Sequence, residues 1–497
     1  MKTKTIYFAL PSYLVIITFL FLTPLTASSQ PPPKKPNVLF ILVDDLRPAL
    51  GCYGDPLAHS PNIDALAARS ISFTRAYTQQ AVCSPSRTAL LTGLRPDETG
   101  VYNLETHFRE RLPDATTLPQ LFKAGGYNVV GLGKVFHTNK STLDSVSWTR
   151  VVPDYGNITY VLPENPMGKG KQKATEEADV NDEAYEDGRI AKGAVEALEQ
   201  LAQSEQPFFL AVGFRKPHSP YSSPKKYWDL YERSSFQVTH RERPTGAPEL
   251  AFHQNQELRG YRDIGTAEII PQEKEREVLH GYYACVSYID AQIGKVMSQL
   301  KSLNLLDNTI IVLWGDHGYH LGEQGQWCKS TNFELATRIP LIVSYPGMPK
   351  KGTKSDAIVE TVDIYPTLAD LCDLKPQGKL SGTSFKEILD RPQRTGDFVA
   401  FSQFVRPYNA INKQNARTHM GYSVRKGEWR CTYWYDVQSN LVERELYRLK
   451  RGEKSETANL AGQPAYKTIE QELAGLIDTY RRGQYTKQSF TATKGTN

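Results

Sequence analysis

The stretch NVLFILVDDL, residues 37–46, contains an unbroken apolar run that ends in two aspartates. A run of this length without polar alternation is typical of a strand buried on both faces, as in a parallel sheet. Ligands of open α/β sheets bind beyond the carboxyl ends of such strands. The stretch therefore predicts an α/β fold and puts Asp44 and Asp45 where a ligand would bind.

Outward from this stretch, apolar runs typical of strands alternate with segments of helical spacing over some 350 residues. The expected strands are ISFTRAY (71–77), YNVVGLG (127–133), PFFLAVGF (207–214), NTIIVLWGDHG (308–318) and RIPLIVSYPG (338–347). The expected helices are SPNIDALAARS (60–70), SRTALLTG (86–93), TTLPQLFKAGG (116–126), residues 182–203 and residues 275–303. Such alternation predicts a large mixed, mostly parallel sheet flanked by helices.

The pattern changes near Gly396. GYSVRKGEWRCTYW and RELYRLKR resemble short antiparallel strands, and AYKTIEQELAGLIDTYRR has amphipathic helical spacing. We therefore expect a main domain over residues 37–395 and a smaller subdomain, an antiparallel sheet plus a helix, over residues 396–497. Residues 167–186 and 240–273 are polar, and we expect them to be long surface insertions that shape access to a site.

The composition is that of an ordinary globular protein. The chain has 497 residues, of which 40% are hydrophobic and 23% are charged. This length exceeds what one core usually supports, so one large domain and a smaller one are expected. The formal net charge of +5 is slight for this size and indicates no nucleic-acid partner.

The N-terminus has a basic start, the apolar run IYFALPSYLVIITFLFLTPLTA (6–27) and small residues after it. These features predict a secretory signal peptide over residues 1–29 and a Pro-rich linker over residues 30–36. An uncleaved anchor is the alternative, since the run approaches a membrane span, but Pro11 and Pro24 disfavour a continuous helix. The folded part is expected to be exported, periplasmic or secreted (lysosomal in a eukaryote), with no stable membrane partner.

Acidic residues follow two expected strands that lie far apart in the chain. Asp44 and Asp45 end the first strand, and Asp316 and His317 end another roughly 270 positions later. In a doubly wound sheet both pairs would converge on one rim. Carboxylates crowded there repel each other and lose solvation, so a hard cation such as calcium is the simple compensation. The three aspartates are the expected oxygen donors, and His317 is softer than calcium prefers.

Positively charged and titratable side chains recur just past other expected strand ends. They are Lys134 and His137 in GLGKVFH, His218 in GFRKPHSPY, Lys329 in WCKSTNFE, and Arg87. The lysines supply point charges for an oxyanion, and the glycines of GLGK let backbone come close to a ligand. Taken singly, a surface lysine or a capping histidine explains each of them. Together they predict an anion-binding basin with proton donors, suited to transfer of phosphate or sulfate.

Cys83 stands at an expected helix start in AVCSPSRTALLTG, residues 81–93. The six cysteines of the chain are sparse, evenly scattered and form no CxxC pair. This spacing disfavours a disulfide scaffold and a zinc–thiolate site. A disulfide, a metal ligand, a nucleophile and an inert core thiol all stay open for Cys83, and half of a disulfide is the default in an exported chain.

Five motifs in order along the chain resemble the sulfatase family, whose formylglycine-dependent members have an alkaline-phosphatase-like fold. CSPSRTALLTG is similar to the signature Cys-x-Pro-x-Arg followed by Leu-Thr-Gly, and GYNVVGLGKVFH is similar to the second family signature. NVLFILVDDLRP, PFFLAVGFRKPH and GDHGYHLGEQGQWCKSTNFELATRIPLIV most resemble the iduronate-2-sulfatase branch. The resemblance runs from about Asn37 to Pro346, with weaker similarity in GYSVRKGEWRCTYW and ELY.

The resemblance implies that a formylglycine-generating or sulfatase-maturating enzyme oxidises Cys83 to formylglycine. The modified residue would surround one calcium ion together with Asp44, Asp45, Asp316 and His317. The resemblance also implies that Arg87 holds the formylglycine hydrate and that Lys134 and Lys329 bind the sulfate oxygens. His218 would donate a proton to the leaving alcohol, and His137 would act on the second hydroxyl of the hydrate.

The implied substrate is a sulfated oligosaccharide or polysaccharide, in first place the 2-O-sulfate of a terminal uronic acid in glycosaminoglycan fragments. Other sulfated polysaccharides, including algal ones, stay open because Tyr319, His320 and Ser330 stand where aromatic substrate contacts of the branch would lie. Two further alternatives are a phosphate or phosphonate ester hydrolase of the same superfamily and a secreted glycan-binding protein whose cysteine is not oxidised.

Overall fold

The computed structural model describes residues 1–10, 35–137, 143–150, 155–266, 269–394, 396–413, 416–450, 452–453 and 455–487. Most of the predicted signal peptide and linker, with Pro11 and Pro24, lies outside the described residues. The chain divides into two units, Met1–Lys35 and Pro36–Asn497, and the described helices and strands lie in the second. None of the described helices has both the length and the apolar character that a membrane span requires.

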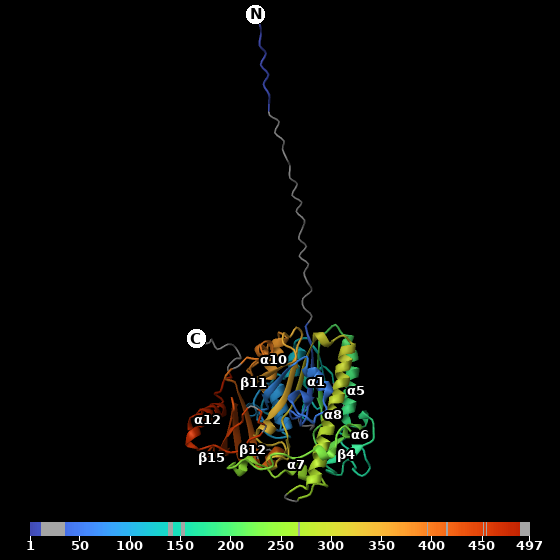
Figure 1. The fold of residues 1–497 in the computed structure, drawn as a ribbon, viewed down its shortest axis with the longest axis vertical. Coiled ribbons are helices and arrows are strands. Elements are labelled where there is room, and N and C mark those ends of the chain that lie inside the picture. Colours follow the sequence, from blue (N-terminus) through green and yellow to red (C-terminus); the bar gives the residue numbers. More distant parts are fainter. Residues whose placement is uncertain are drawn as a thin grey trace. The chain divides into compact units, whose positions relative to one another are not determined.

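The main sheet of the described chain has seven strands in the order β11-β2-β10-β7-β1-β5-β3 (Figure 1). Their bounds are β1 Asn37–Val43, β2 Ile71–Tyr77, β3 Asn128–Gly133, β5 Phe208–Phe214, β7 Thr309–Gly315, β10 Arg338–Ser344 and β11 Thr353–Glu360. Strand β1 pairs in parallel with β5 and β7, β3 with β5, and β2 with β11, whereas β10 is antiparallel to both neighbours. The predicted mixed, mostly parallel sheet is confirmed.

Helices cover both faces of this sheet because its central strands are apolar on both faces. Successive strand residues point to opposite sides, and Leu39, Ile41 and Val43 of β1 pack in one core with residues of α5 and α8. The alternate residues from Val38 to Leu42 pack in a second core with α2, α4 and α10. Figure 1 shows α5 and α8 on one side of the sheet and α10 on the other. These helices are α2 Cys83–Thr92, α4 Leu118–Ala124, α5 Glu186–Ala202, α8 Gln272–Ser302 and α10 Ile364–Leu371.

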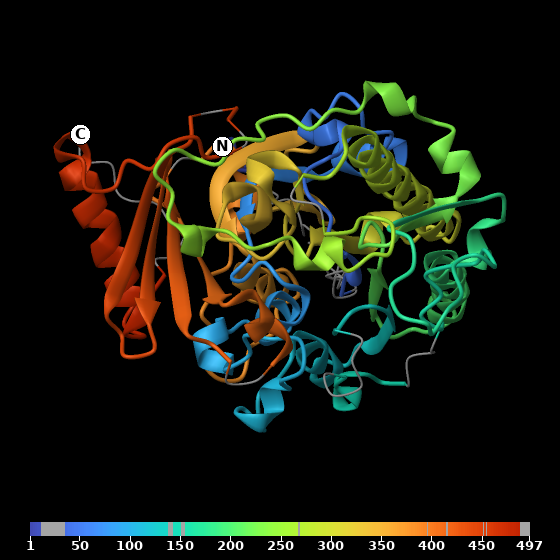
Figure 2. The same ribbon diagram turned by 90° about the horizontal axis from the view of Figure 1, so that it is seen from below.

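A second, antiparallel sheet follows in the order β12-β13-β14-β15. Its strands are β12 Val399–Arg406, β13 His419–Lys426, β14 Trp429–Asp436 and β15 Leu441–Arg448. Helix α12, Lys467–Arg481, buries Leu473 and Ile477 against this sheet and lies beside its strands in Figure 2. The predicted C-terminal antiparallel sheet with a helix is confirmed, whereas the boundary at residue 396 stays a prediction. Strands β11 and β12 are not among those expected from the sequence.

The remaining described elements are short. The helices are α1 Pro61–Ala67, α3 Pro96–Thr99, α6 Lys225–Trp228, α7 Gln256–Arg259, α9 Glu334–Thr337 and α11 Lys386–Asp390. The strands are β4 Thr175–Ala178, β6 Tyr221–Pro224, β8 His320–Leu321 and β9 Trp327–Cys328.

The expectation of a surface insertion over residues 167–186 is wrong for its second half. Strand β4 pairs in parallel with β6, and Glu176 on β4 is only 3% exposed. Its carboxylate accepts hydrogen bonds from the backbone N–H of Val161, at 2.7 Å, and from the Tyr185 hydroxyl, at 2.8 Å. The acidic side chain that makes the segment look like a solvated loop is therefore satisfied inside the fold.

Candidate active site

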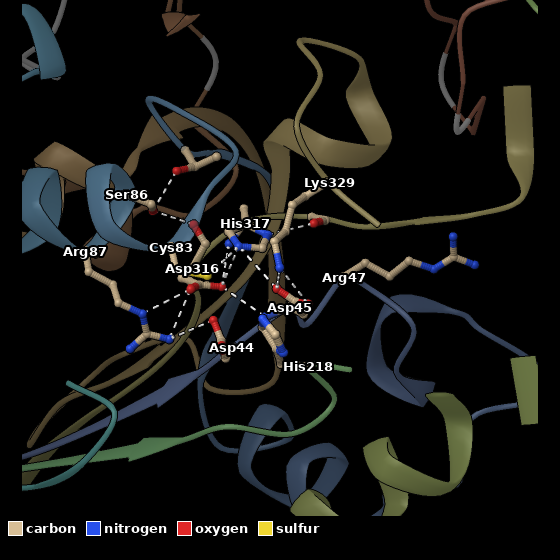
Figure 3. A network of polar contacts seen from close by, with 12 residues as sticks. Asp44, Asp45, Arg47, Cys83, Ser86, Arg87, His218, Asp316, His317 and Lys329 are labelled. Carbon is tan, nitrogen blue, oxygen red and sulfur yellow. Dashed lines mark hydrogen bonds and ion pairs between the residues drawn. The ribbon is translucent and has the colours of Figure 1, made fainter. Parts of the chain in front are cut away.

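The carboxyl ends of β1, β5 and β7 are joined at one edge of the main sheet. Asp44 N–H donates to the Phe214 carbonyl at the end of β5, and Asp316 N–H donates to the Val43 carbonyl, both at 3.2 Å. Asp45 N–H donates to Asp316 Oδ1 at 3.0 Å. The structure thus brings the acidic ends of two strands together, 271 residues apart in sequence (Figure 3).

Helix α2 brings Cys83 and Arg87 to the same place. Cys83 is the first residue of this fully buried helix, three residues before the expected start, and its Sγ lies 3.6 Å from His317 Nε2. Arg87 donates from Nε to Asp316 Oδ2 at 3.0 Å and from Nη2 to Asp44 Oδ1 at 3.4 Å. All six cysteines lie in described parts of the chain and all are free thiols, so Cys83 is not half of a disulfide here.

Lys134 follows β3 where the chain passes close to β5. Gly133 has a φ of +66°, and a Cβ on it would lie 2.3 Å from the Gly213 carbonyl oxygen. That same oxygen accepts a hydrogen bond from Lys134 N–H at 2.8 Å. The glycine therefore permits close contact between strands, and the expected approach of backbone to a ligand stays a prediction. The ammonium of Lys134 pairs with Asp44, and His137 lies three residues further on the same loop.

Lys329 and His218 contact Glu257, a residue that the sequence analysis missed. Lys329 Nζ lies 2.9 and 3.0 Å from the two Asp45 carboxylate oxygens and 2.8 Å from Glu257 Oε1. His218 Nε2 lies 3.6 Å from the same Oε1. Glu257 is on α7, inside the polar segment 240–273. The sequence indicates this residue only indirectly, through the expectation that the segment shapes access to the site.

The three residues expected at substrate-contacting positions are all buried. The Tyr319 hydroxyl is 2.9 Å from that of Tyr221, and His320 Nε2 is 2.9 Å from the Thr331 hydroxyl. Tyr319, His320 and Ser330 are each 0% exposed. The Tyr319 ring centroid lies 5.9 Å from Lys329 Nζ, so this ring packs against the lysine from inside the protein.

Burial and charge act differently on the three aspartates. Burial opposes ionisation of Asp44, but the charges of Lys134 and Arg87 more than offset it and hold its pKa well below the usual value. Burial raises the pKa of Asp45 well above the usual value, against the charge of Lys329. Burial and the charge of Asp44 raise the pKa of Asp316 to about 7. Asp44 is therefore held ionised, whereas burial favours the neutral forms of Asp45 and Asp316.

The thiol and the imidazoles of the cluster are held neutral. Burial, then the charge of Asp44, raises the pKa of Cys83 well above its usual value, so its thiol is not a reactive thiolate at neutral pH. Burial, and to a lesser degree the charge of Lys329, lowers the pKa values of His317 and His218 well below the usual value. Burial, then the charge of Lys134, lowers that of His137 to about 3.

The orientation of His317 fits a bound cation. Its Nδ1 lies 3.0 Å from the Gly318 carbonyl, so Nδ1–H donates there and Nε2 carries the lone pair. That lone pair lies 3.3 Å from Asp45 Oδ1 and 3.5 Å from Asp316 Oδ1, which are also acceptors. A cation shared by these groups would replace the protons that the raised pKa values of Asp45 and Asp316 otherwise favour there.

The donor atoms are also close enough to share one ion. One ligand atom each from Asp44, Cys83, Asp316 and His317 lie within 4.8 Å of one another, and so do those of Asp44, Asp45, Cys83 and His218. Carboxylate oxygens, which hard divalent cations prefer, make up half of each group. The three aspartates therefore fit a calcium-type ion, whereas the imidazoles and the Cys83 sulfur are softer than such an ion prefers.

Buried carboxylates, cationic side chains and histidines at the carboxyl edge of an α/β sheet are suited to the hydrolysis of a charged ester. The family model "Sulfatase" matches residues 36–374, and the model "N-sulphoglucosamine sulphohydrolase, C-terminal" matches residues 322–483. The chain belongs to the sulfatase family.

Similar proteins span nearly the whole chain. It is 35% identical to human iduronate 2-sulfatase in an alignment that covers 80% of this chain and 84% of that protein. It is 27% identical to an ulvan-active sulfatase of Formosa agariphila in an alignment that covers 95% of this chain and 88% of that protein. The solved phosphonate monoester hydrolase of Agrobacterium radiobacter has the same fold, with a TM-score of 0.75 at 22% identity over 91% of this chain and 96% of that one. The chain is thus a sulfuric ester hydrolase similar to iduronate 2-sulfatase.

Proposed function

We propose that the enzyme removes the 2-O-sulfate of a terminal uronic acid in glycosaminoglycan fragments, using one calcium ion and a formylglycine formed from Cys83. The observation that carries the chemistry is the convergence of Cys83 with Asp44, Asp316 and His317 at the edge of the sheet. The similarity to human iduronate 2-sulfatase supports the choice of sugar.

Asp44, Asp45, Asp316, His317 and residue 83 would hold the calcium, which lowers the cost of ionising a bound hydroxyl. Formylglycine supplies a hydrated aldehyde with two hydroxyls on one carbon, one to attack sulfur and one to release the sulfate. The raised pKa of the Cys83 thiol supports this assignment, because an unmodified thiol would stay protonated and weakly nucleophilic at neutral pH.

Arg87, Lys134 and Lys329 would neutralise the sulfate and orient the group at position 83. In the structure these side chains pair with Asp316, Asp44 and Asp45 respectively. Once those carboxylates ligate a cation, the lysine N–H groups can donate to sulfate oxygens. Their charge then stabilises the negative charge that the transition state carries at sulfur.

The two histidines would move the protons. His218 Nδ1 lies 2.6 Å from the Ser219 carbonyl, which fixes Nδ1–H there and leaves Nε2 facing Glu257 and the site. The His218 side chain is 24% exposed, so Nε2, once it has taken up a proton in the reaction, would donate it to an alcohol that leaves toward solvent. His137 would accept the proton of the second hydroxyl, for which its pKa of about 3 keeps it neutral.

The test combines mass spectrometry with a substrate panel. The tryptic peptide around Cys83, from active protein made in its own host, should carry the aldehyde, and an intact thiol would refute the mechanism. Turnover should be fastest on 2-O-sulfated uronate disaccharides. Faster turnover of ulvan oligosaccharides would favour an algal substrate, and faster cleavage of nitrophenyl phosphate than of nitrophenyl sulfate would favour a phosphate or phosphonate ester hydrolase. Glycan binding without turnover would favour the non-catalytic alternative.

We also propose that the protein is exported through the segment 1–29. The basic start, apolar run and small residues of this segment support the proposal. N-terminal sequencing of protein from its own host should find a start near Gln30. A retained Met1 would favour the anchor instead.

A further inference from the structure

Glu257 lies at the outer edge of the catalytic cluster. The side chains of Asp44, Asp45 and Asp316 are 0% exposed, and that of Lys329 is 3% exposed. Those of Glu257 and His218 are 11% and 24% exposed. Exposure therefore rises from the carboxylates toward His218 and Glu257, on the side from which a sugar would enter.

With the proposed roles of Lys329 and His218, the contacts of Glu257 would put it beside the linkage between sulfate and sugar. Its Oε1 lies 2.8 Å from Lys329 Nζ, the proposed sulfate ligand, and 3.6 Å from His218 Nε2, the proposed donor to the bridging oxygen. A group that lies against both is next to the carbon that carries the ester. Both contacts use Oε1, so Oε2 can accept a hydrogen bond from a bound sugar.

The backbone around Glu257 is fixed to the loop that carries Lys329. The side chain of Asn255 accepts from Trp327 N–H at 2.8 Å and donates to the Gly325 carbonyl at 3.0 Å. The next residue of α7, Leu258, is 0% exposed. The carboxylate is therefore positioned before a substrate arrives, as a recognition group needs to be.

We propose that Glu257 is a specificity-determining residue that accepts a hydrogen bond from the free hydroxyl next to the scissile sulfate. The inference rests on the proposed function. In a 2-O-sulfated uronic acid carbon 1 is in the glycosidic bond, so the neighbouring free hydroxyl is on carbon 3. A carboxylate accepts from that hydroxyl and repels a second sulfate in its place, so Glu257 selects for the former and against the latter.

The test measures binding to Cys83→Ala protein with calcium, which cannot turn substrate over. The ligands are a 2-O-sulfated uronate disaccharide, its 3-deoxy analogue and its 2,3-di-O-sulfated form. We expect the parent to bind about tenfold to a hundredfold tighter than the deoxy analogue, the range of one hydrogen bond to a charged group. Adding Glu257→Gln should shrink that ratio to about threefold and strengthen binding of the disulfated form about tenfold. Gln256→Ala, an exposed change on the same helix, is the control and should alter none of these.

Two results overturn the proposal. If Glu257→Gln weakens binding of the parent and of the deoxy analogue equally, Glu257 only holds Lys329. If the variant binds the disulfated form as weakly as before, the charge of Glu257 does not repel the second sulfate. If Glu257→Gln fails to fold, Glu257→Asp replaces it and should lower the ratio while keeping the exclusion. A protein that binds ulvan oligosaccharides instead refutes the sugar assignment alone, and the same comparison is then made with a deoxy analogue of that saccharide.

Discussion

Replacing Arg87 with methionine should lower the free energy of unfolding of the calcium-free protein by about 3–5 kcal/mol, the usual cost of breaking a buried ion pair. The guanidinium is 1% exposed and reaches Asp316, Asp44 and two backbone carbonyls. Both carboxylates are 0% exposed, so water cannot replace the lost partner. Protonation of Asp316, whose pKa is already about 7, sets the lower end of the range.

The assay is urea denaturation at pH 7.5 in a chelator. Arg87→Lys keeps the charge but not the planar set of donors, so we expect an intermediate loss. Arg243→Met is the control, because Arg243 and its partner Glu249 have side chains 46% and 88% exposed. Exposed pairs of this kind contribute under about 1 kcal/mol.

Calcium provides the second arm of the same experiment. Because the carboxylates that Arg87 neutralises are the proposed calcium ligands, saturating calcium should reduce the cost of Arg87→Met by at least about 1 kcal/mol. A loss below about 1 kcal/mol in the chelator would show that the buried pair is not what holds these strand ends. A loss that calcium leaves unchanged would separate Arg87 from the cation site.

Three further outcomes are expected. Cys83→Ala should abolish turnover but keep the circular dichroism spectrum and cost about 1 kcal/mol of stability; an unfolded variant would make the thiol structural. Chelation should abolish sulfate ester hydrolysis and calcium should restore it, and activity that persists in the chelator would contradict the cation site. Burial raises the pKa of Glu445 to about 7 from 4.5, so the folded protein holds an extra proton between these values and loses stability as pH rises through them. The free energy of unfolding of Glu445→Gln, relative to that of the wild type, should therefore rise by up to about 3 kcal/mol between pH 4.5 and 8. Urea titrations at several pH values measure this difference, and a pH-independent difference would contradict the expectation.

The sequence predicts the main sheet well because its strands are buried on both faces. An apolar run such as residues 37–43 has no solvated face, so the local pattern alone predicts a strand buried on both faces. The positions of Asp44, Asp45, Asp316 and His317 follow, since parallel strands end at one edge. Strand β4 is missed for the opposite reason. Its Glu176 is buried by hydrogen bonds that come from elsewhere in the chain, and local composition does not report them.

Glu257 is out of reach for the same physical reason. Its partner Lys329 is 72 residues away, and the four residues of α7 have no apolar period that would mark a functional face. The glycines of GLGK show a subtler difference. Their freedom is correctly inferred, but the close contact of Gly133 is with a neighbouring strand, and only tertiary structure distinguishes that contact from an approach to a ligand.

In the proposed mechanism, different kinds of structure carry the reaction chemistry and the selection of substrate. The aspartates sit at the ends of strands whose positions are fixed by backbone hydrogen bonds and by helices packed on both faces. Rigid elements of this kind hold reacting groups within the narrow geometry that catalysis needs. Glu257 comes instead from an insertion outside the sheet, which can change in length and sequence without moving a strand. A change at Glu257 should therefore alter which saccharide is bound while the pairing of Arg87 with Asp44 and Asp316 is retained.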